Sequence, residues 1–340
     1  MTVRVGINGF GRIGRSFTRA LLERGGSDVE LVAVNDPFGD AEVMAFLLKH
    51  DSVGRTLSNE IKATADGFSI DGKEIKKLEV KDPAEIPWGD QGVDVVIEST
   101  GVFTAREKAA GHLAGGAKRV IISAPSGDAD ATICMGVNED VFDAAQHQVI
   151  SNASCTTNCL APMAKVLNDR FGIIQGFMMT IHAYTSDQQL QDQAAPTRSG
   201  KPDLRRMRAA ALSIIPSSTG AAKAIGLVLP ELNGKLNGGS MRVPTPTGSI
   251  TDLTVTLEKS ASVDEINAAF NEGASDAKLG TVLDYSDEPL VSSDIIGNPA
   301  SCIYSAVDTI ASGNMVKVLG WYDNEWGYSN RLIDLVSFVG

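Results

Sequence analysis

The chain has 340 residues, of which 43% are hydrophobic and 21% are charged, as is typical of a globular protein with two domains. Its formal net charge of −12 argues against binding to nucleic acid or to an anionic membrane. Four cysteines are too few for a disulfide framework in a chain of this size, so we expect free thiols in a reducing compartment.

The N-terminal half alternates strand and helix patterns. Met1–Asn8 leads directly into a strand without signal-peptide features, and no apolar stretch approaches the ~18 residues of a membrane span, so a cytoplasmic protein is expected. Mostly apolar strands separated by helices predict a parallel sheet covered on both faces, with an antiparallel excursion in residues 55–90. The expected strands are Val3–Asn8, Val29–Asn35, Gly92–Thr100 and Arg119–Ala124, and the expected helices are Gly14–Arg24 and Val43–Leu48.

The pattern changes near residue 150. A helical stripe from Leu160 to Phe171 contains Pro162, which predicts either a kink or an irregular first turn. In Thr251–Glu258 apolar and polar residues alternate, as in a half-exposed antiparallel sheet. Residues 187–203 are expected to form a long polar loop. Further elements are expected as a strand at Phe177–Ala183 and helices at Asp264–Phe270 and Asn330–Phe338.

Gly9, Gly11 and Gly14 form the pattern G-x-G-x-x-G between the first strand and the first helix. This context predicts a dinucleotide site in which the backbone approaches the pyrophosphate at the helix N-terminus. Asp36 stands 22 residues after Gly14, at the end of the second strand, and is expected to bind the adenosine ribose hydroxyls. Its carboxylate repels a 2′-phosphate, which favours NAD over NADP. The alternative is a glycine-rich turn without a ligand.

Cys155 is the candidate nucleophile. It stands in a Ser/Thr/Asn-rich segment at the start of a helix, where the helix dipole favours the thiolate. Cys134 and Cys302 suit small buried residues, and no cluster completes a metal site around Cys155 and Cys159. His182, at the end of a strand, is the candidate general base, although spacing alone barely separates it from a structural histidine.

Four sequence blocks occur in order, at residues 7–15, 151–162, 218–224 and 321–331. They read INGFGRIGR, SNASCTTNCLAP, STGAAKA and WYDNEWGYSNR, and with them the whole chain resembles phosphorylating glyceraldehyde-3-phosphate dehydrogenase. The resemblance implies an α/β fold, with an N-terminal Rossmann dinucleotide-binding domain and an α+β catalytic domain that has a mostly antiparallel mixed sheet. It implies a homotetramer. The implied NAD-binding domain spans residues 1–154, completed by a C-terminal helix at 322–340, and the catalytic domain spans 155–321.

The resemblance also implies the reaction. D-glyceraldehyde 3-phosphate, inorganic phosphate and NAD give 1,3-bisphosphoglycerate and NADH through a Cys155 hemithioacetal and thioester, with His182 as the base. Besides the three glycines, the implied cofactor-binding residues are Arg12, Ile13, Asp36, Lys81, Ser123 and Asn324. The family often has arginine where Lys81 stands. The implied substrate-phosphate residues are Thr185 and Arg242, and those for the attacking phosphate are Ser154, Thr156, Arg205, Thr219 and Gly220.

Three other kinds of protein are alternatives to this assignment. Erythrose-4-phosphate dehydrogenase uses similar machinery, a semialdehyde dehydrogenase has a related fold, and a non-catalytic binding or adhesion protein belongs to another class. Retention of both Cys155 and His182 argues against the last. Ten residues, 193–202, separate Asp192 from Asp203 where many relatives have fewer, and this insertion is expected to bulge outward while Arg205 keeps its place.

Overall fold

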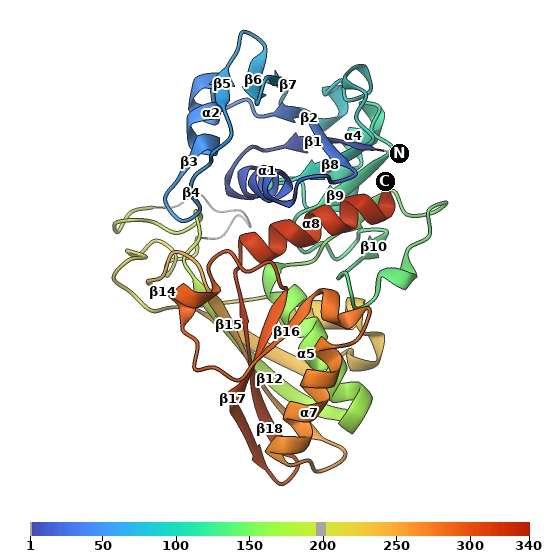
Figure 1. Cartoon of the computed structure of the whole chain (residues 1–340), viewed down its shortest axis with the longest axis vertical. Coiled ribbons are helices and arrows are strands. Elements are labelled where there is room, and N and C mark those ends of the chain that lie inside the picture. The colour runs from blue at the N-terminus through green and yellow to red at the C-terminus, as the bar shows by residue number, and fades with distance from the viewer. Residues whose placement is uncertain (1, 195–201) are drawn as a thin grey trace. The chain divides into compact units, whose positions relative to one another are not determined.

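The computed structural model describes residues 2–194 and 202–340. The chain forms two compact units, which we call unit 1 and unit 2 (Figure 1). Unit 1 comprises Met1–Ile133, Asp140–Ala153 and Ser329–Gly340. Unit 2 comprises Cys134–Glu139 and Ser154–Tyr328.

Unit 1 contains a nine-stranded sheet in the order β10-β11-β9-β8-β1-β2-β7-β6-β5. Neighbours from β10 to β7 are parallel, which confirms the Rossmann-type prediction, and β5 and β6 form the antiparallel excursion. Because β1 lies between β2 and β8, the strand order reverses beside it, the usual place for a ligand at the carboxyl ends of the strands. The strands are β1 (Val3–Asn8), β2 (Val29–Asn35), β5 (Ile61–Ala63), β6 (Gly67–Ile70), β7 (Lys73–Leu78), β8 (Val95–Glu98), β9 (Arg119–Ile122), β10 (Ala131–Thr132) and β11 (Val149–Ser151).

The helices of unit 1 begin where the sequence supplies a cap or a turn. Asp40 caps α2 (Ala41–Lys49) by accepting from the Val43 amide at 2.7 Å. α1 (Arg12–Arg24) instead begins at Gly11 with no side-chain cap. The other short elements here are α3 (Arg106–Ala109), α4 (Gly111–Ala114), the hairpin of β3 (His50–Asp51) with β4 (Arg55–Thr56), and the 3₁₀ turns η1 (Pro83–Glu85), η2 (Gly89–Gln91) and η3 (Glu139–Val141).

The last helix, α8 (Trp326–Val339), belongs to unit 1 from Ser329 onward. Arg24 Nε donates to Asn330 Oδ1 at 2.8 Å, and Arg119 Nη1 donates to the Val339 carbonyl at 2.6 Å. A cation at the last turn of a helix complements its dipole, so Arg119 stabilises the C-terminal end of α8, while Arg24 holds the helix near its start.

Unit 2 contains a seven-stranded sheet in the order β13-β14-β12-β15-β18-β17-β16. Two of its strand pairs are parallel and four are antiparallel, which confirms a mostly antiparallel mixed sheet. The predicted alternation is present in β15, whose residues are buried and half-buried in turn. The strands are β12 (Ile173–Ala183), β13 (Ile215–Ser217), β14 (Leu236–Val243), β15 (Ser249–Leu257), β16 (Leu283–Ser286), β17 (Cys302–Ser312) and β18 (Met315–Tyr322).

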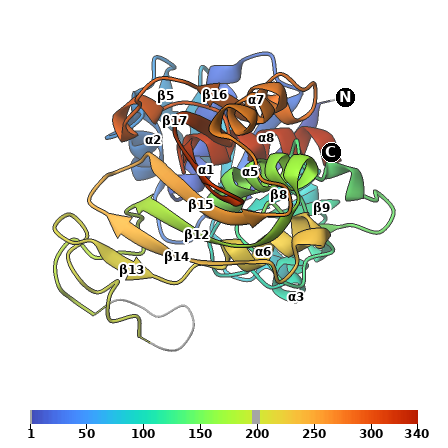
Figure 2. The ribbon, with the colours of Figure 1, turned by 90° about the horizontal axis from the view of Figure 1, so that it is seen from below.

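Three helices form one layer on this sheet. α5 (Cys155–Phe171) packs on β12, β15, β17 and β18 and touches both α6 (Ala221–Val228) and α7 (Val263–Ala274). α5 is helical through Pro162. Because the helix begins at Cys155, Pro162 is its eighth residue and lies well beyond the first turn, so the alternative of an irregular first turn is wrong. Figure 2 shows β13, β14, β12 and β15 following one another. The 3₁₀ turns are η4 (Pro230–Leu232), η5 (Leu279–Thr281) and η6 (Ser292–Ile295).

Candidate functional site

The turn after β1 forms a cradle for an anion. Gly9 has φ 91°, and a Cβ there would lie 2.8 Å from the Thr100 amide nitrogen, so no other residue fits without strain. A Cβ on Gly11 would meet nothing within 4 Å. Open space at Gly11 faces the uncapped N-terminus of α1, whose first turn contains no acidic residue. The backbone amides of a helix's first turn and the positive end of its dipole suit a pyrophosphate, so these residues fit a dinucleotide.

The other predicted cofactor residues of unit 1 lie along the same carboxyl edge. Asp36 follows β2, and its Oδ2 accepts from the Phe10 amide at 3.0 Å, which ties the carboxylate to the glycine turn. Lys81 is exposed and follows the β7 strand after a short link. Ser123 follows β9, and its amide donates to the Glu98 carbonyl at 2.9 Å. Arg12 and Ile13 open α1, where Arg12 forms an ion pair with Asp51.

Cys155 is the first residue of α5 in unit 2. Ala153, with φ 55°, turns the chain into the helix, and Ser154 Oγ caps it by accepting from the Thr157 amide at 3.0 Å. The Cys155 Sγ lies 3.4 Å from His182 Nε2. The structure therefore brings together the two side chains that the sequence predicts as nucleophile and base. All four cysteines are free.

His182 projects from β12 toward the helix layer, as do the buried Met178 and Thr180 at alternate positions. Its Nδ1 lies 2.7 Å from the Ala183 carbonyl oxygen and 2.6 Å from Arg242 Nη1. The two contacts select opposite tautomers, because the carbonyl can only accept and the guanidinium can only donate. A base role for Nε2 requires the tautomer in which Nδ1–H donates to the Ala183 carbonyl.

Burial controls the charge of this pair. Desolvation raises the pKa of the Cys155 thiol to about 11, although the nearby Arg242 lowers it. Desolvation and Arg242 together lower the pKa of His182 to about 3. The direction for Cys155 is opposite to the one expected from its place at a helix start. At neutral pH both groups are therefore uncharged, a thiol beside a neutral imidazole.

Arg242 reaches His182 because the two residues are register partners on the parallel strands β12 and β14. Burial lowers the pKa of Arg242. Thr185 lies two residues beyond β12, and its hydroxyl donates to Asp187. Burial opposes ionisation of Asp187, but the Thr185 hydroxyl and the Arg206 guanidinium lower its pKa. At this edge of the sheet, the cationic side chains of Arg242 and Arg206 therefore lie close to the Asp187 carboxylate.

The residues implied for the attacking phosphate lie at helix starts and on one turn. Thr219 and Gly220 precede α6, with Thr219 Oγ1 accepting from the Ala221 amide at 3.2 Å. Arg205 is exposed, and its Nη1 donates to the Pro216 carbonyl at 3.4 Å. Its neighbour Arg206 is instead held by ion pairs with Asp187 and Asp203. The structure thus separates two adjacent arginines that spacing alone does not.

Tyr322 was not singled out from the sequence, although it stands in the motif at residues 321–331. Its hydroxyl is 2.9 Å from Thr156 Oγ1 and 2.7 Å from Thr180 Oγ1, and its ring meets the His182 ring edge-on with centroids 5.9 Å apart. Burial raises the pKa of Tyr322, so the hydroxyl stays neutral. Its hydroxyl joins the start of α5 to β12, and its ring contacts His182 of the cysteine–histidine pair.

Asn324 is the predicted cofactor residue of unit 2. It is buried, and its Oδ1 accepts from the Ser249 hydroxyl at 2.8 Å. Ser249 Oγ in turn accepts from the Ala183 amide at 3.0 Å, so Asn324 is connected to the strand that carries His182. With its oxygen occupied, the amide nitrogen of Asn324 is the group that can donate to a ligand carbonyl.

Part of the predicted insertion, including Pro196, Arg198, Gly200 and Lys201, lies outside the described residues. Within residues 2–194 and 202–340, no group of three or more His, Cys, Asp or Glu side chains could hold a metal ion. In the same residues, every helix is too short or too polar to cross a membrane.

Comparison with known proteins gives concordant results for both halves of the chain. Residues 3–106 match the family model described as "Glyceraldehyde 3-phosphate dehydrogenase, NAD binding domain", and residues 154–324 match the C-terminal domain of the same family. The chain is 59% identical to glyceraldehyde-3-phosphate dehydrogenase of Streptomyces coelicolor over 341 aligned residues. It is also 59% identical to the proteins of that name from Mycolicibacterium smegmatis and Mycobacterium tuberculosis. Each alignment covers 100% of this chain and 99% of the relative.

Proposed function

Because the chain belongs to the glyceraldehyde-3-phosphate dehydrogenase family, we propose that it catalyses a step of glycolysis, the oxidative phosphorylation of D-glyceraldehyde 3-phosphate with reduction of NAD. The product is 1,3-bisphosphoglycerate. The observation that carries this proposal is the 3.4 Å contact between Cys155 Sγ and His182 Nε2, next to Arg242. A nucleophile, a base and a cation in one place are what an aldehyde bearing a phosphate needs for oxidation to an acyl phosphate.

The chemistry follows from the properties of these residues. The Cys155 sulfur adds to the aldehyde carbon, and the thiol proton ends on the former carbonyl oxygen, giving a hemithioacetal. His182 then takes the hydroxyl proton while a hydride leaves the same carbon, and a thioester remains on Cys155. NAD, when bound, supplies the acceptor for that hydride. Inorganic phosphate attacks the thioester and releases the Cys155 sulfur and the acyl phosphate. The base role rests on geometry: when Nδ1–H donates to the Ala183 carbonyl, the Nε2 lone pair faces Cys155 and can accept the hydroxyl proton.

We assign the anion sites by the positions of the arginines. Arg242 and Thr185, beside His182, bind the phosphate of the substrate. Arg205, with Thr219, Gly220, Ser154 and Thr156, binds the attacking phosphate. The ion pairs of Arg206 support this division, since they occupy the neighbouring guanidinium and leave Arg205 at the surface. Arginine suits both sites because it stays charged and binds oxyanions in a bidentate manner.

For the cofactor, we assign the pyrophosphate to Gly9, Gly11, Gly14 and the start of α1, with Arg12 and Ile13. Asp36 accepts from the ribose hydroxyls, and its charge favours NAD over NADP. Lys81 contributes on the adenine side, and Ser123 and Asn324 contribute on the nicotinamide side.

We also propose that the NAD-binding domain spans 1–154 with 322–340, and the catalytic domain 155–321. The two compact units and the contacts of Arg24 and Arg119 with α8 support this division.

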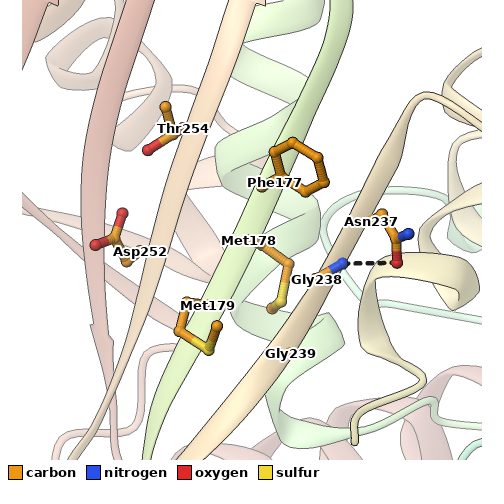
Figure 3. Close-up of a pocket in the computed structure, with 8 residues that line it drawn as sticks. All are labelled: Phe177, Met178, Met179, Asn237, Gly238, Gly239, Asp252 and Thr254. Carbon is orange, nitrogen blue, oxygen red and sulfur yellow. Dashed lines mark hydrogen bonds between the residues drawn. The ribbon is translucent and has the colours of Figure 1, made fainter.

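We further propose that the protein is a homotetramer, in which a second copy covers the open face of the unit 2 sheet. α5, α6 and α7 occupy one face, and the other face carries Phe177, which is 71% exposed, beside Met179. A hollow of about 510 Å³ lies there between β12, β14 and β15, where Gly238 and Gly239 have no side chains (Figure 3). Exposed apolar surface of this kind marks an interface.

The oligomer has its own test. Sedimentation velocity should give a tetramer for the wild type and smaller species for Phe177→Glu. The matched control is Leu227→Glu, which places the same charge at an exposed leucine on α6 and should remain tetrameric. A monomeric wild type would contradict the proposal.

The four free cysteines support a cytoplasmic location.

The activity is tested by NADH formation with D-glyceraldehyde 3-phosphate, with and without inorganic phosphate. Sustained turnover should require phosphate. Erythrose 4-phosphate should be the poorer substrate by kcat/KM, and the reverse order would assign the chain to the related aldehyde instead.

A further inference from the structure

The last side chains of three neighbouring strands in unit 1 form a buried chain of hydrogen bonds. Asn35 ends β2, Asn8 ends β1 and Glu98 ends β8, and Asn8 is the register partner of both. Asn35 Nδ2 donates to Asn8 Oδ1 at 2.7 Å, and Asn8 Nδ2 donates to Glu98 Oε2 at 2.6 Å. All three residues are at most 2% exposed. Polar side chains at this depth require partners, and here they satisfy one another.

The chain of hydrogen bonds continues beyond Asn35 and beyond Glu98. Beyond Asn35, the Val80 amide donates to Asn35 Oδ1, and Asn35 Nδ2 donates to the Val80 carbonyl, both at 2.9 Å. Beyond Glu98, His112 Nε2 lies 3.0 Å from Glu98 Oε2, and the Trp88 indole N–H donates to His112 Nδ1 at 3.0 Å. An indole can only donate, so Nδ1 is the acceptor and Nε2 carries the proton. From Asn35 and from Trp88, the side-chain donors therefore run inward to Glu98, and Asn35 Nδ2 also donates outward to the Val80 carbonyl.

The Glu98 carboxylate accepts hydrogen bonds from Asn8 on one side, from His112 on the other, and from Thr100 in the turn that follows β8. Its Oε1 takes the amide of Thr100 at 2.8 Å and the Thr100 hydroxyl, while Oε2 takes Asn8 and His112. Thr100 is the residue that Gly9 abuts most closely. The carboxylate thus fixes the turn after β8 against the glycine turn after β1.

Three links of this hydrogen-bond chain immediately precede residues of the proposed cofactor site. Gly9 follows Asn8, Asp36 follows Asn35, and Lys81 follows Val80. A buried chain that is bonded across the strand ends fixes the spacing of the turns above it, because its amides and imidazole each have one allowed orientation. The mechanism uses none of its members directly.

We propose that Glu98 and the side chains that converge on it position the NAD-binding turns of unit 1, an inference that rests on the proposed function. Glu98→Gln keeps the shape of the side chain but replaces one acceptor oxygen with a donor. In one orientation the new NH₂ faces the Thr100 amide, which can only donate. In the other it faces the His112 Nε2–H, which stays a donor as long as Trp88 fixes the tautomer. Because two donors then face each other, the turns after β1 and β8 move apart.

The test measures NAD binding to the full-length protein by calorimetry. Glu98→Gln should weaken NAD binding about tenfold, the usual effect of one unsatisfied buried donor, and raise the KM for NAD by a similar factor while changing kcat less than twofold. Trp88→Phe removes only the outermost donor and frees the imidazole to change tautomer, so combining it with Glu98→Gln should recover part of the affinity. Ile75→Val, a core truncation in the same unit, should lower the melting temperature without changing NAD affinity.

If Glu98→Gln does not fold, Asn35→Ala provides the same measurement from the other end of the chain. A folded Glu98→Gln or Asn35→Ala protein that binds NAD within twofold of the wild type would overturn the inference. So would a loss of affinity in Ile75→Val as large as in Glu98→Gln, since that is general destabilisation. Failure of the wild type itself to bind NAD would overturn the proposed function instead.

Discussion

The two units build their sites in different ways. In unit 1 the candidate residues follow the ends of adjacent parallel strands, and one short motif, Gly9 to Gly14, contains the centre of the site. In unit 2 the candidate residues come from a helix start, from β12 and from β14, and Cys155, His182 and Arg242 are far apart in the sequence. A site at strand ends tolerates changes in single contacts, because many backbone groups share the ligand. A site that depends on one sulfur and one imidazole does not, so we expect larger losses from single substitutions in unit 2.

The largest expected effect is that of Cys155→Ser. Turnover should fall by about 10⁴-fold or more, because the hydroxyl is a far weaker nucleophile and no thioester can form. NAD affinity, measured by calorimetry, should stay within a small factor of the wild type because the cofactor turns lie in unit 1. Cys159→Ser, one helical turn further on, is the matched control and should keep most activity. Substantial phosphorylating activity in Cys155→Ser would exclude this cysteine as the nucleophile.

His182→Asn should slow thioester formation by about 10²–10⁴-fold, the range for loss of a general base. It should also change how the free energy of unfolding depends on pH. Because the folded pKa of His182 is lowered to about 3, the unfolded chain binds more protons below its ordinary pKa of about 6.5, and folding stability falls as pH decreases between these values.

Denaturant unfolding from pH 7 to pH 4 measures this dependence. The wild type should lose up to about 1.4 kcal/mol more per pH unit than His182→Asn over the lower part of this range. Parallel curves for the two proteins would show that the imidazole is not held neutral.

In unit 1, Asp36→Gly should weaken NAD binding by about tenfold to a hundredfold, because a carboxylate that accepts charge-assisted bonds from the ribose is lost. Discrimination against NADP should relax at the same time, since the charge that repels the 2′-phosphate is removed. The measurement is the ratio of kcat/KM for the two cofactors. A parent enzyme that uses NADP as efficiently as NAD would refute the electrostatic argument.

The smallest effect concerns Arg205. Arg205→Leu should raise the KM for inorganic phosphate by about tenfold, the usual cost of one charge-assisted hydrogen bond. Arg206→Leu, the neighbouring control, should mainly lower the melting temperature, because it breaks ion pairs with Asp187 and Asp203. Trimming residues 193–202 should leave the phosphate KM nearly constant. If trimming raises it as much as Arg205→Leu, the insertion itself holds the phosphate turn.

The difference between the two sheets also explains which strands can be predicted from the sequence. β1 and β2 occur at the residues expected, because short apolar runs bounded by turn residues specify buried parallel strands. β13, β14 and β16 to β18 were not predicted. Their sheet order is not their chain order, and no local pattern shows which strands become neighbours. The pairing of Cys155 with His182 could be weighed from residue type and position, whereas the choice of Arg205 over Arg206 depended on family resemblance.

Two features escaped sequence reasoning for the same physical reason. The Tyr322 hydroxyl bridges Thr156 and Thr180, and the Glu98 carboxylate accepts from Asn8 on β1, from His112 on α4 and from Thr100 in the turn after β8. Each depends on contacts between elements far apart in the chain. Only the tertiary structure shows that these polar residues are buried and bonded to one another.

The most direct test of the cysteine–histidine mechanism is a rapid-mixing experiment without inorganic phosphate. Wild-type protein with NAD and D-glyceraldehyde 3-phosphate should release a single burst of one NADH per subunit, and peptide mass spectrometry should find the acyl group on Cys155. Adding phosphate should discharge that group and restart NADH formation. Continuous NADH formation without phosphate, or an unmodified Cys155 peptide after the burst, would contradict the account.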